Sequence, residues 1–206
     1  MPEDEMIEQS IIAVGKKLRF GQGYFSPQRG LAQSHDHVRY ADFRVQHAVA
    51  TTLAGDADRK LFQWLSYIPG KINQVPLGGL DILSGGFTGC WMAIYMMGGR
   101  RYVGHIGTED QPNSANSLAV KQAWRDFVGS PGVNAAGFTA FQPHLVLDDN
   151  RVRQIVISSG VQNKVVGLVT TNLHCFSVVL LGIDPNTWRV GAVRQMQPHN
   201  GTHLFP

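Results

Sequence analysis

Two apolar runs separated by a pair of glycines occupy the middle of the chain. Residues 91–97 (WMAIYMM) are apolar and aromatic, and residues 100–107 (RRYVGHIG) follow directly after Gly98 and Gly99. Runs of this length and composition are typical of strands, and a two-residue loop of glycines favours a primed hairpin turn. The pattern therefore predicts an antiparallel hairpin in this part of the chain.

Apolar residues at helical spacing mark two other segments. Residues 58–68 carry apolar side chains at helical intervals and end at a Pro-Gly pair, so they predict a helix. Residues 115–128 predict a second helix, with Asn113 or Ser114 as its N-cap. The apolar stripe expected to be buried on this second helix is made of Leu118, Ala119, Gln122, Ala123 and Phe127.

The second half of the chain alternates apolar runs with turn signals. This pattern predicts an antiparallel sheet with strands at residues 144–147, 152–158, 164–170, 173–183 and 188–196. Near the N-terminus, residues 21–40 predict a loop, whereas residues 6–20 and 40–53 fit either a helix or strands. Together the elements predict an α+β fold, with a mixed or antiparallel β-sandwich and one or two packed helices.

Length and charge narrow the class of protein. A chain of 206 residues predicts a single domain over residues 1–206, with residues 1–40 as a candidate irregular segment. The net charge of +3 is dispersed, which argues against nucleic acid as a partner, and no apolar run is long enough for membrane insertion. Two cysteines make no disulfide framework, so a reducing environment is expected. We therefore expect a cytoplasmic protein, or one exported without a cleavable signal that acts in another cell's cytosol.

Isolated histidines do not build a metal site in this sequence. His35 and His37 form a His-x-His pair, and His199 and His203 have the spacing of half a zinc site, but neither pair has further ligands at a recognisable spacing. We expect His35 and His37 to be loop histidines, and no metal bound at either pair.

The register of the predicted hairpin brings a thiol near an imidazole. Counting outward from the two-glycine loop, Met92 faces His105 and Cys90 faces Gly107. Side chains alternate between faces with a period of two, so Cys90 and His105 share one face as diagonal neighbours, with Cβ atoms about 7–8 Å apart. A loop of three residues would place them on opposite faces.

A cysteine beside a histidine is a candidate nucleophile. An adjacent imidazole favours the thiolate, which attacks carbonyl carbons, and the imidazole then protonates the leaving amine. The glycines around residue 90, including Gly89, allow close approach of a ligand, and Gly107 leaves the thiol unobstructed. Trp91 is a candidate wall of a substrate slot. The group that orients His105 is left open among a main-chain carbonyl and five side chains, namely Ser84, Thr88, Thr108, Glu109 and Asp110.

Residues 83–90 (LSGGFTGC) and 102–108 (YVGHIGT) resemble the catalytic core of the cytotoxic necrotizing factor deamidases and of related bacterial glutamine deamidases, including the chemotaxis receptor deamidases. The resemblance implies a compact, deamidase-like α/β structure on a mixed β-sandwich. It implies hydrolysis of a protein glutamine to glutamate through a thioester, without a metal or organic cofactor. In this chain an insertion of residues 86–89 separates Leu-Ser-Gly from the cysteine.

Carried onto this sequence, the resemblance assigns roles to individual residues. Cys90 is the expected nucleophile, His105 the general acid and base, and Ser84 or Thr88 the hydroxyl that orients them. Expected substrate-binding positions are Gly89, Trp91, Gly107 and Thr108. The expected partner is a protein that carries the target glutamine, and a toxin or effector role in virulence follows from the family.

Two other functions fit the same residues. A cysteine peptidase or a transglutaminase uses the same Cys-His pair with a different substrate or acceptor. A non-enzymatic binding domain instead makes Cys90 a buried structural thiol, as we expect of Cys175 in its apolar strand.

Overall fold

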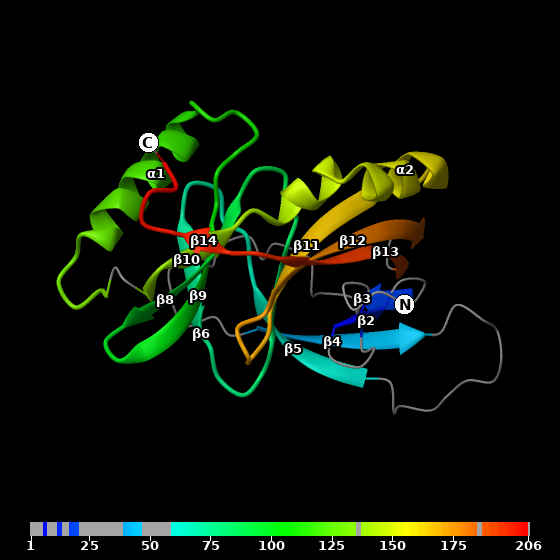
Figure 1. The fold of residues 1–206 in the computed structure, drawn as a ribbon, viewed down its shortest axis with the longest axis horizontal. Helices are drawn as coiled ribbons and strands as arrows, with labels where there is room; N and C mark the ends of the chain where they lie inside the picture. The colour runs from blue at the N-terminus through cyan, green and yellow to red at the C-terminus, as the bar shows by residue number, and fades with distance from the viewer. Residues whose placement is uncertain are drawn as a thin grey trace.

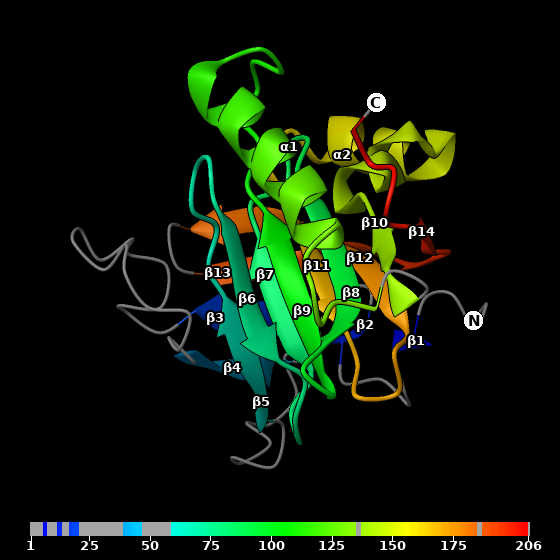
Figure 2. The ribbon, with the colours of Figure 1, turned by 90° about the vertical axis from the view of Figure 1, so that its left-hand side faces the viewer.

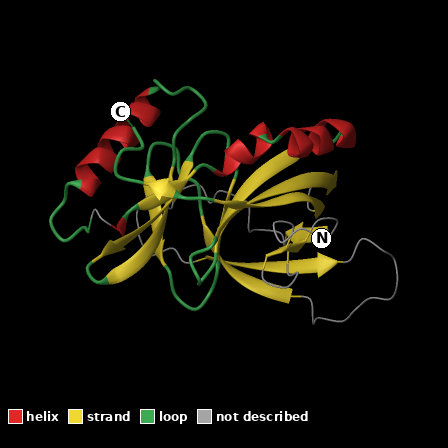
Figure 3. Cartoon of the chain, viewed as in Figure 1, coloured by secondary structure: helices red, strands yellow, loops and turns green. Residues whose placement is uncertain are grey.

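The computed structural model describes residues 59–134, 137–184 and 187–205, together with four shorter segments at residues 6–7, 12–13, 17–20 and 39–46. These residues form an α+β fold in which two mainly antiparallel sheets lie side by side, as Figure 1 shows. Figure 3 shows the helices of the described part lying outside the strands. The predicted α+β class is confirmed.

The first sheet has five strands and contains the predicted hairpin. Every pair of neighbours in it is antiparallel. Its order is β14 (His199–Asn200), β10 (Thr139–Phe141), β8 (Trp91–Met97), β9 (Arg100–Ile106) and β6 (Ile72–Pro76).

The second sheet has seven strands and closes on itself. Its order is β11 (Asn163–Val169), β12 (Cys175–Asp184), β13 (Thr187–Met196), β3 (Lys17–Phe20), β4 (Arg39–Gln46), β5 (Arg59–Leu65) and β7 (Ile82–Gly85). Strand β7 completes the closure because it pairs with β11 on one side and, in parallel, with β5 on the other. A separate pair, β1 (Met6–Ile7) and β2 (Ile12–Ala13), lies near the N-terminus.

The hairpin β8–β9 has the predicted register. Gly98 and Gly99 connect the strands with φ of 56° and 77°, which is the left-handed region at both turn positions. Met92 pairs with His105 as expected. The glycine pair therefore sets which side chains of both strands share a face.

Alternation along this hairpin separates two cores. One face carries Tyr95, which packs against Trp124 and Phe138 under helix α1 (Ala115–Val128). Figure 2 shows α1 on the outer side of the five-stranded sheet. The other face carries Cys90 and Met92 into a core that both sheets share. The predicted thiol thus lies at the junction of the two sheets.

Three predicted elements are wrong, beginning with the helix at residues 58–68. The described structure has strand β5 there. Gln63, Trp64 and Leu65 are buried in succession, and β5 pairs with β4 on one edge and β7 on the other. Continuous burial of this kind produces an apolar run that periodicity cannot distinguish from a helix.

Two predicted strands in the second half are helical. Residues 152–158 lie in helix α2 (Asn150–Ser159), and residues 144–147 lie in a 3₁₀ helix (Pro143–Asp148). Asp149 is the N-cap of helix α2, and Gly160, which has a left-handed φ of 63°, is its C-cap. These end signals favour a helix over the alternating apolar pattern between them.

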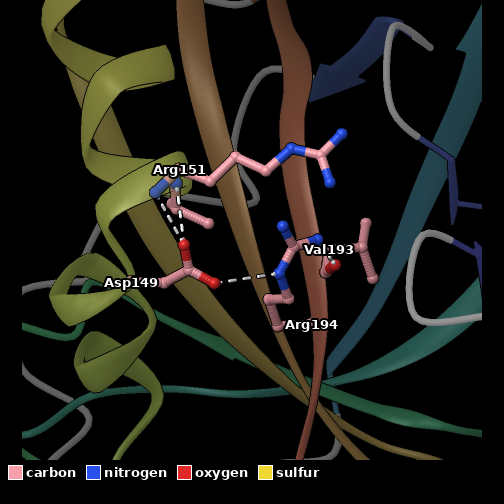
Figure 4. Close-up of polar contacts among 5 residues, drawn as sticks. Asp149, Arg151, Val193 and Arg194 are labelled. Carbon is pink, nitrogen blue, oxygen red and sulfur yellow. Dashed lines mark hydrogen bonds and ion pairs between the residues drawn. The ribbon is translucent and has the colours of Figure 1, made fainter. Parts of the chain in front are cut away.

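Asp149 also attaches α2 to the closed sheet. Its Oδ1 accepts hydrogen bonds from the backbone N–H groups of Arg151 at 2.8 Å and Val152 at 3.2 Å. Its Oδ2 lies 3.4 Å from Nε of Arg194 on β13, as Figure 4 shows. One carboxylate therefore caps the helix and holds it on the sheet.

Helix α1 lies where predicted but buries a different stripe. Ser114 is its N-cap and accepts a hydrogen bond from the N–H of Ser117. The buried side chains are Ser117, Val120 and Trp124, whereas Leu118 is 51% exposed. The largest side chain decides the rotation, because Trp124 buries more area in the aromatic core than the alanines of the predicted stripe.

Several predictions fall partly outside the described residues. The candidate metal pair His35 and His37 lies outside them, as does most of the irregular segment expected over residues 1–40. Within residues 6–20 and 39–46, the described positions are strands rather than helix.

Candidate functional site

Cys90 lies at the end of a glycine-rich loop, immediately before β8. Its side chain is 1% exposed, and its Sγ donates a hydrogen bond to the main-chain oxygen of Thr108 at 3.0 Å. Burial raises the pKa of the Cys90 thiol, and hydrogen bonding with Thr108 and Gly89 partly offsets this effect. The thiol is therefore protonated in this structure.

His105 is held by Ser84, across the junction between β9 and β7. The hydroxyl Oγ of Ser84 lies 2.7 Å from His105 Nδ1 and donates to the main-chain oxygen of Leu65 at 2.6 Å. A serine has one hydroxyl hydrogen to donate, and here it is donated to the Leu65 carbonyl. His105 Nδ1 therefore carries a hydrogen and donates it to Ser84, which leaves the Nε2 atom as an unprotonated acceptor.

The imidazole of His105 is fully buried and neutral. Burial lowers its pKa to about 3, so the ring holds no charge at neutral pH. Phe87 stacks on the ring at 4.3 Å, and Tyr67 lies against it at 5.3 Å. Within the described structure, Nε2 is buried without a hydrogen-bond partner. Such an acceptor costs folding free energy, which makes it a candidate functional atom.

The thiol and the imidazole share a face but are not bonded to each other. The register puts Cys90 and His105 on the same side of the hairpin, as predicted. However, Cys90 Sγ bonds to Thr108, and His105 Nε2 bonds to none of the described residues. The resting arrangement therefore holds the two reactive atoms apart.

Among the candidate orienting groups, Ser84 contacts His105 and Thr88 does not form this contact. The hydroxyl of Thr88 donates to Asp110 Oδ1 at 2.6 Å. The carboxylate of Glu109 accepts from Ser114 and Asn116 at the start of α1, and these hydrogen bonds lower its pKa. Thr88 and Glu109 therefore belong to the rim of the site.

The expected substrate-binding residues lie in different places. Thr108 contacts the thiol through its main-chain oxygen, and Gly89 accepts a hydrogen bond from Gln142 at 3.2 Å. Trp91 lies on the opposite face of the sheet, where it packs against His199 and Phe205. Side-chain alternation separates it from Cys90, so the expectation that Trp91 lines the slot is wrong for this arrangement.

Gly107 is packed against backbone rather than opening the site. A Cβ at this position would meet the main-chain oxygen of Ile68 at 2.2 Å. Its N–H bonds to the oxygen of Lys71, and its oxygen accepts from the N–H of Gly70. The glycine therefore allows the segment between β5 and β6 to lie against β9.

An open cleft of about 400 Å³ lies at the rim of the site, and neither Cys90 nor His105 lines it. Tyr67 connects this cleft to the thiol, because it lines the cleft and its hydroxyl donates, at 3.2 Å, to the Thr108 oxygen that also accepts from Cys90. The residues that line the cleft are Tyr67, Gly86, Thr88, Glu109, Asp110 and Gln111. The sequence pattern did not indicate Tyr67, since an aromatic residue in an apolar run is typical of any core.

Neither a known protein family, nor a curated protein, nor a solved structure matches this chain. The resemblance to the glutamine deamidases therefore stays a prediction from the residues. The described part of the chain contains no group of three or more His, Cys, Asp or Glu side chains placed to hold a metal ion. Over residues 59–134, 137–184 and 187–205, no helix has the length and apolar character to cross a membrane.

Proposed function

We propose that this protein is a cysteine-dependent hydrolase that converts a glutamine side chain of another protein into glutamate. The observation that carries the proposal is the state of His105. Ser84 holds its Nδ1–H, and the unprotonated Nε2 is buried on the hairpin face that carries Cys90. This is the tautomer that a general base needs to activate a thiol.

The proposed reaction has two stages. His105 Nε2 takes the proton from Cys90 Sγ, and the thiolate attacks the amide carbon of the glutamine. The imidazolium protonates the amide nitrogen of the tetrahedral adduct, the C–N bond breaks, ammonia leaves, and a thioester remains. Nε2 then takes a proton from water, whose oxygen attacks the thioester; the C–S bond breaks, glutamate is released, and the imidazolium returns the proton to the Cys90 sulfur.

The resting structure requires two movements before this reaction. Cys90 Sγ has to turn from the Thr108 oxygen toward His105 Nε2, and the loop over residues 85–89 has to open to admit a substrate, because Cys90 is only 1% exposed. Glycines at residues 85, 86 and 89 give this loop wide backbone freedom, and Gly86 already has a left-handed φ of 37°. We therefore include opening of residues 85–89 in the proposal.

The family resemblance supports the choice of substrate and setting. We propose a protein partner, reached in the cytosol of the producing cell or, for an effector or toxin, in that of a host cell. A peptidase or a transglutaminase with the same Cys-His pair differs only in the bond that is broken or in the acceptor. Product masses separate the three, because amide hydrolysis leaves the chain intact and adds no amine.

A second candidate is a binding domain in which Cys90 is structural. Its burial and its raised pKa favour this candidate. Cys175 offers a matched comparison within the chain, because it is equally buried, and burial raises its pKa to about 12. A structural Cys90 should react with iodoacetamide as slowly as Cys175, whereas an enzyme whose loop opens should label faster at Cys90.

The deciding experiment incubates the protein with a cytosolic extract and maps glutamines converted to glutamate by mass spectrometry. We expect conversion at specific sites with the wild-type protein and with Cys175→Ser, and none with Cys90→Ser. The Cys90→Ser protein should keep its stability within about 1 kcal/mol, because the change is nearly isosteric. Conversion that persists in Cys90→Ser would rule out the proposed nucleophile.

A further inference from the structure

Tyr67 contacts three parts of the site that the proposed reaction needs. Its hydroxyl donates to the Thr108 oxygen, its ring lies 5.3 Å from the ring of His105, and it lines the open cleft. The side chain is half-buried, so it reaches from the cleft to the buried pair. It follows β5 in the chain, whereas Cys90 lies between β7 and β8 and His105 lies on β9.

The Thr108 oxygen places the phenol beside the thiol. It accepts hydrogen bonds from both Cys90 Sγ, at 3.0 Å, and Tyr67 Oη, at 3.2 Å. Two donors on one carbonyl oxygen are compatible as long as the thiol keeps its proton. Once Cys90 is deprotonated, its sulfur becomes an acceptor and no longer benefits from the carbonyl. The Tyr67 O–H then has a charged acceptor nearby, and it turns toward it by rotation about one C–O bond.

The phenol is suited to donate and not to ionise. Burial, followed by the charges of Cys90, Glu109 and Asp110, raises the pKa of Tyr67 to about 12. The hydroxyl therefore keeps its hydrogen at every pH at which an imidazole base works. Hydrogen bonds to a charged acceptor are roughly twice as strong as those between neutral groups, so the interaction is stronger after deprotonation.

We propose that Tyr67 is a third catalytic residue, whose hydroxyl donates a hydrogen bond to the Cys90 thiolate and then to the oxygen that becomes negative in the tetrahedral adduct. This inference rests on the proposed function for its catalytic meaning. Tyr67 is a hydrogen-bond donor that the sequence pattern did not predict. The proposal also makes the part of the cleft next to Tyr67 the entry for the glutamine side chain.

The test replaces Tyr67 by phenylalanine, which keeps the ring against His105 and removes only the hydroxyl. The rate of Cys90 alkylation by iodoacetamide is measured against pH in the variant and in the wild type. We expect the midpoint of the profile to rise by about one pH unit, because the thiolate loses a charge-assisted donor. Tyr102→Phe is the matched control, since Tyr102 stacks with Tyr95 on the other face of the sheet.

A role confined to packing would leave the alkylation midpoint of Tyr67→Phe unchanged, and that result would overturn the inference. Where a glutamine substrate has been found, kcat should fall about 100-fold with little change in KM, as for loss of an oxyanion donor. The alkylation profile needs no substrate, so it decides the Tyr67 donor even if no glutamine is converted. Absence of conversion by the wild type counts against the proposed function, and an unchanged midpoint counts against Tyr67.

Discussion

At the scale of single residues, one hydroxyl hydrogen determines the state of the candidate base. Ser84 gives its hydrogen to the Leu65 oxygen, so His105 has to donate from Nδ1. The sequence left five side chains as candidates for this role because it does not show which strands meet. Ser84 fills it because β7 and β9 belong to different sheets that meet here, which local spacing does not report.

Two glycines lie next to Cys90, Gly89 in the sequence and Gly107 in the strand register, and substituting them should affect stability to different extents. We expect Gly107→Ala to lower the free energy of unfolding by about 3 kcal/mol, because its Cβ would lie 2.2 Å from the backbone oxygen of Ile68. Gly89→Ala should change stability by less than about 1 kcal/mol, because no atom lies within 4 Å of its Cβ position. Urea denaturation measures both. Equal stability of the two variants would show that the segment between β5 and β6 does not pack on Gly107 as described.

At the scale of elements, the sequence was most informative where glycine dictates backbone geometry. The Gly98-Gly99 turn predicted the pairing of β8 with β9, and with it the shared face of Cys90 and His105. Apolar periodicity failed where burial did not follow a single face. In β5 the consecutive residues Gln63, Trp64 and Leu65 are all buried, and on α2 only Val152 is fully buried. The caps of α2, Asp149 and Gly160, were present in the sequence and carried the better signal.

Helix α2 offers a direct test of its cap. Asp149→Ala should lower the free energy of unfolding by about 1 kcal/mol, because two N–H groups of the first turn lose their acceptor. Asp148→Ala is the matched control, since its 72% exposed carboxylate makes only a long contact to Arg153. The control should cost about 0.5 kcal/mol or less. Chemical denaturation of both variants measures the difference, and an equal loss would contradict the capping role.

At the scale of the whole molecule, the candidate site lies between the two sheets. The hydrogen bond between Ser84 and His105 joins the closed sheet to the five-stranded sheet, and Cys90 packs in the core that both sheets share. The site and the packing of the two sheets therefore depend on each other. A buried, neutral imidazole in this position links protonation to the stability of the fold.

The free energy of unfolding should fall as the pH is lowered from about 6.5, where an unfolded histidine begins to bind a proton, toward 3. The pKa of His105 in the folded protein is about 3, so within this range the unfolded state binds one proton more. The loss from His105 approaches about 1.4 kcal/mol per pH unit. His105→Asn removes this titration and keeps an amide group near Ser84.

Urea denaturation at pH 7 and pH 5 tests this linkage by comparing the variant with the wild type. The decrease in stability between the two pH values should be smaller in His105→Asn, while the other histidines contribute equally to both proteins. Identical decreases would mean that His105 accepts a proton without unfolding, and that its burial is incomplete.

The sequence by itself determined the hairpin, the helix over residues 115–128, most of the later strands and the placement of Cys90 and His105 on one face. Each of these follows from interactions between residues close in the chain, such as turn glycines, caps and side-chain alternation. The tertiary structure alone decided that Ser84 holds His105, that Trp91 faces away and that Tyr67 adjoins the thiol. These depend on how two sheets pack, and packing is set by contacts between segments far apart in sequence.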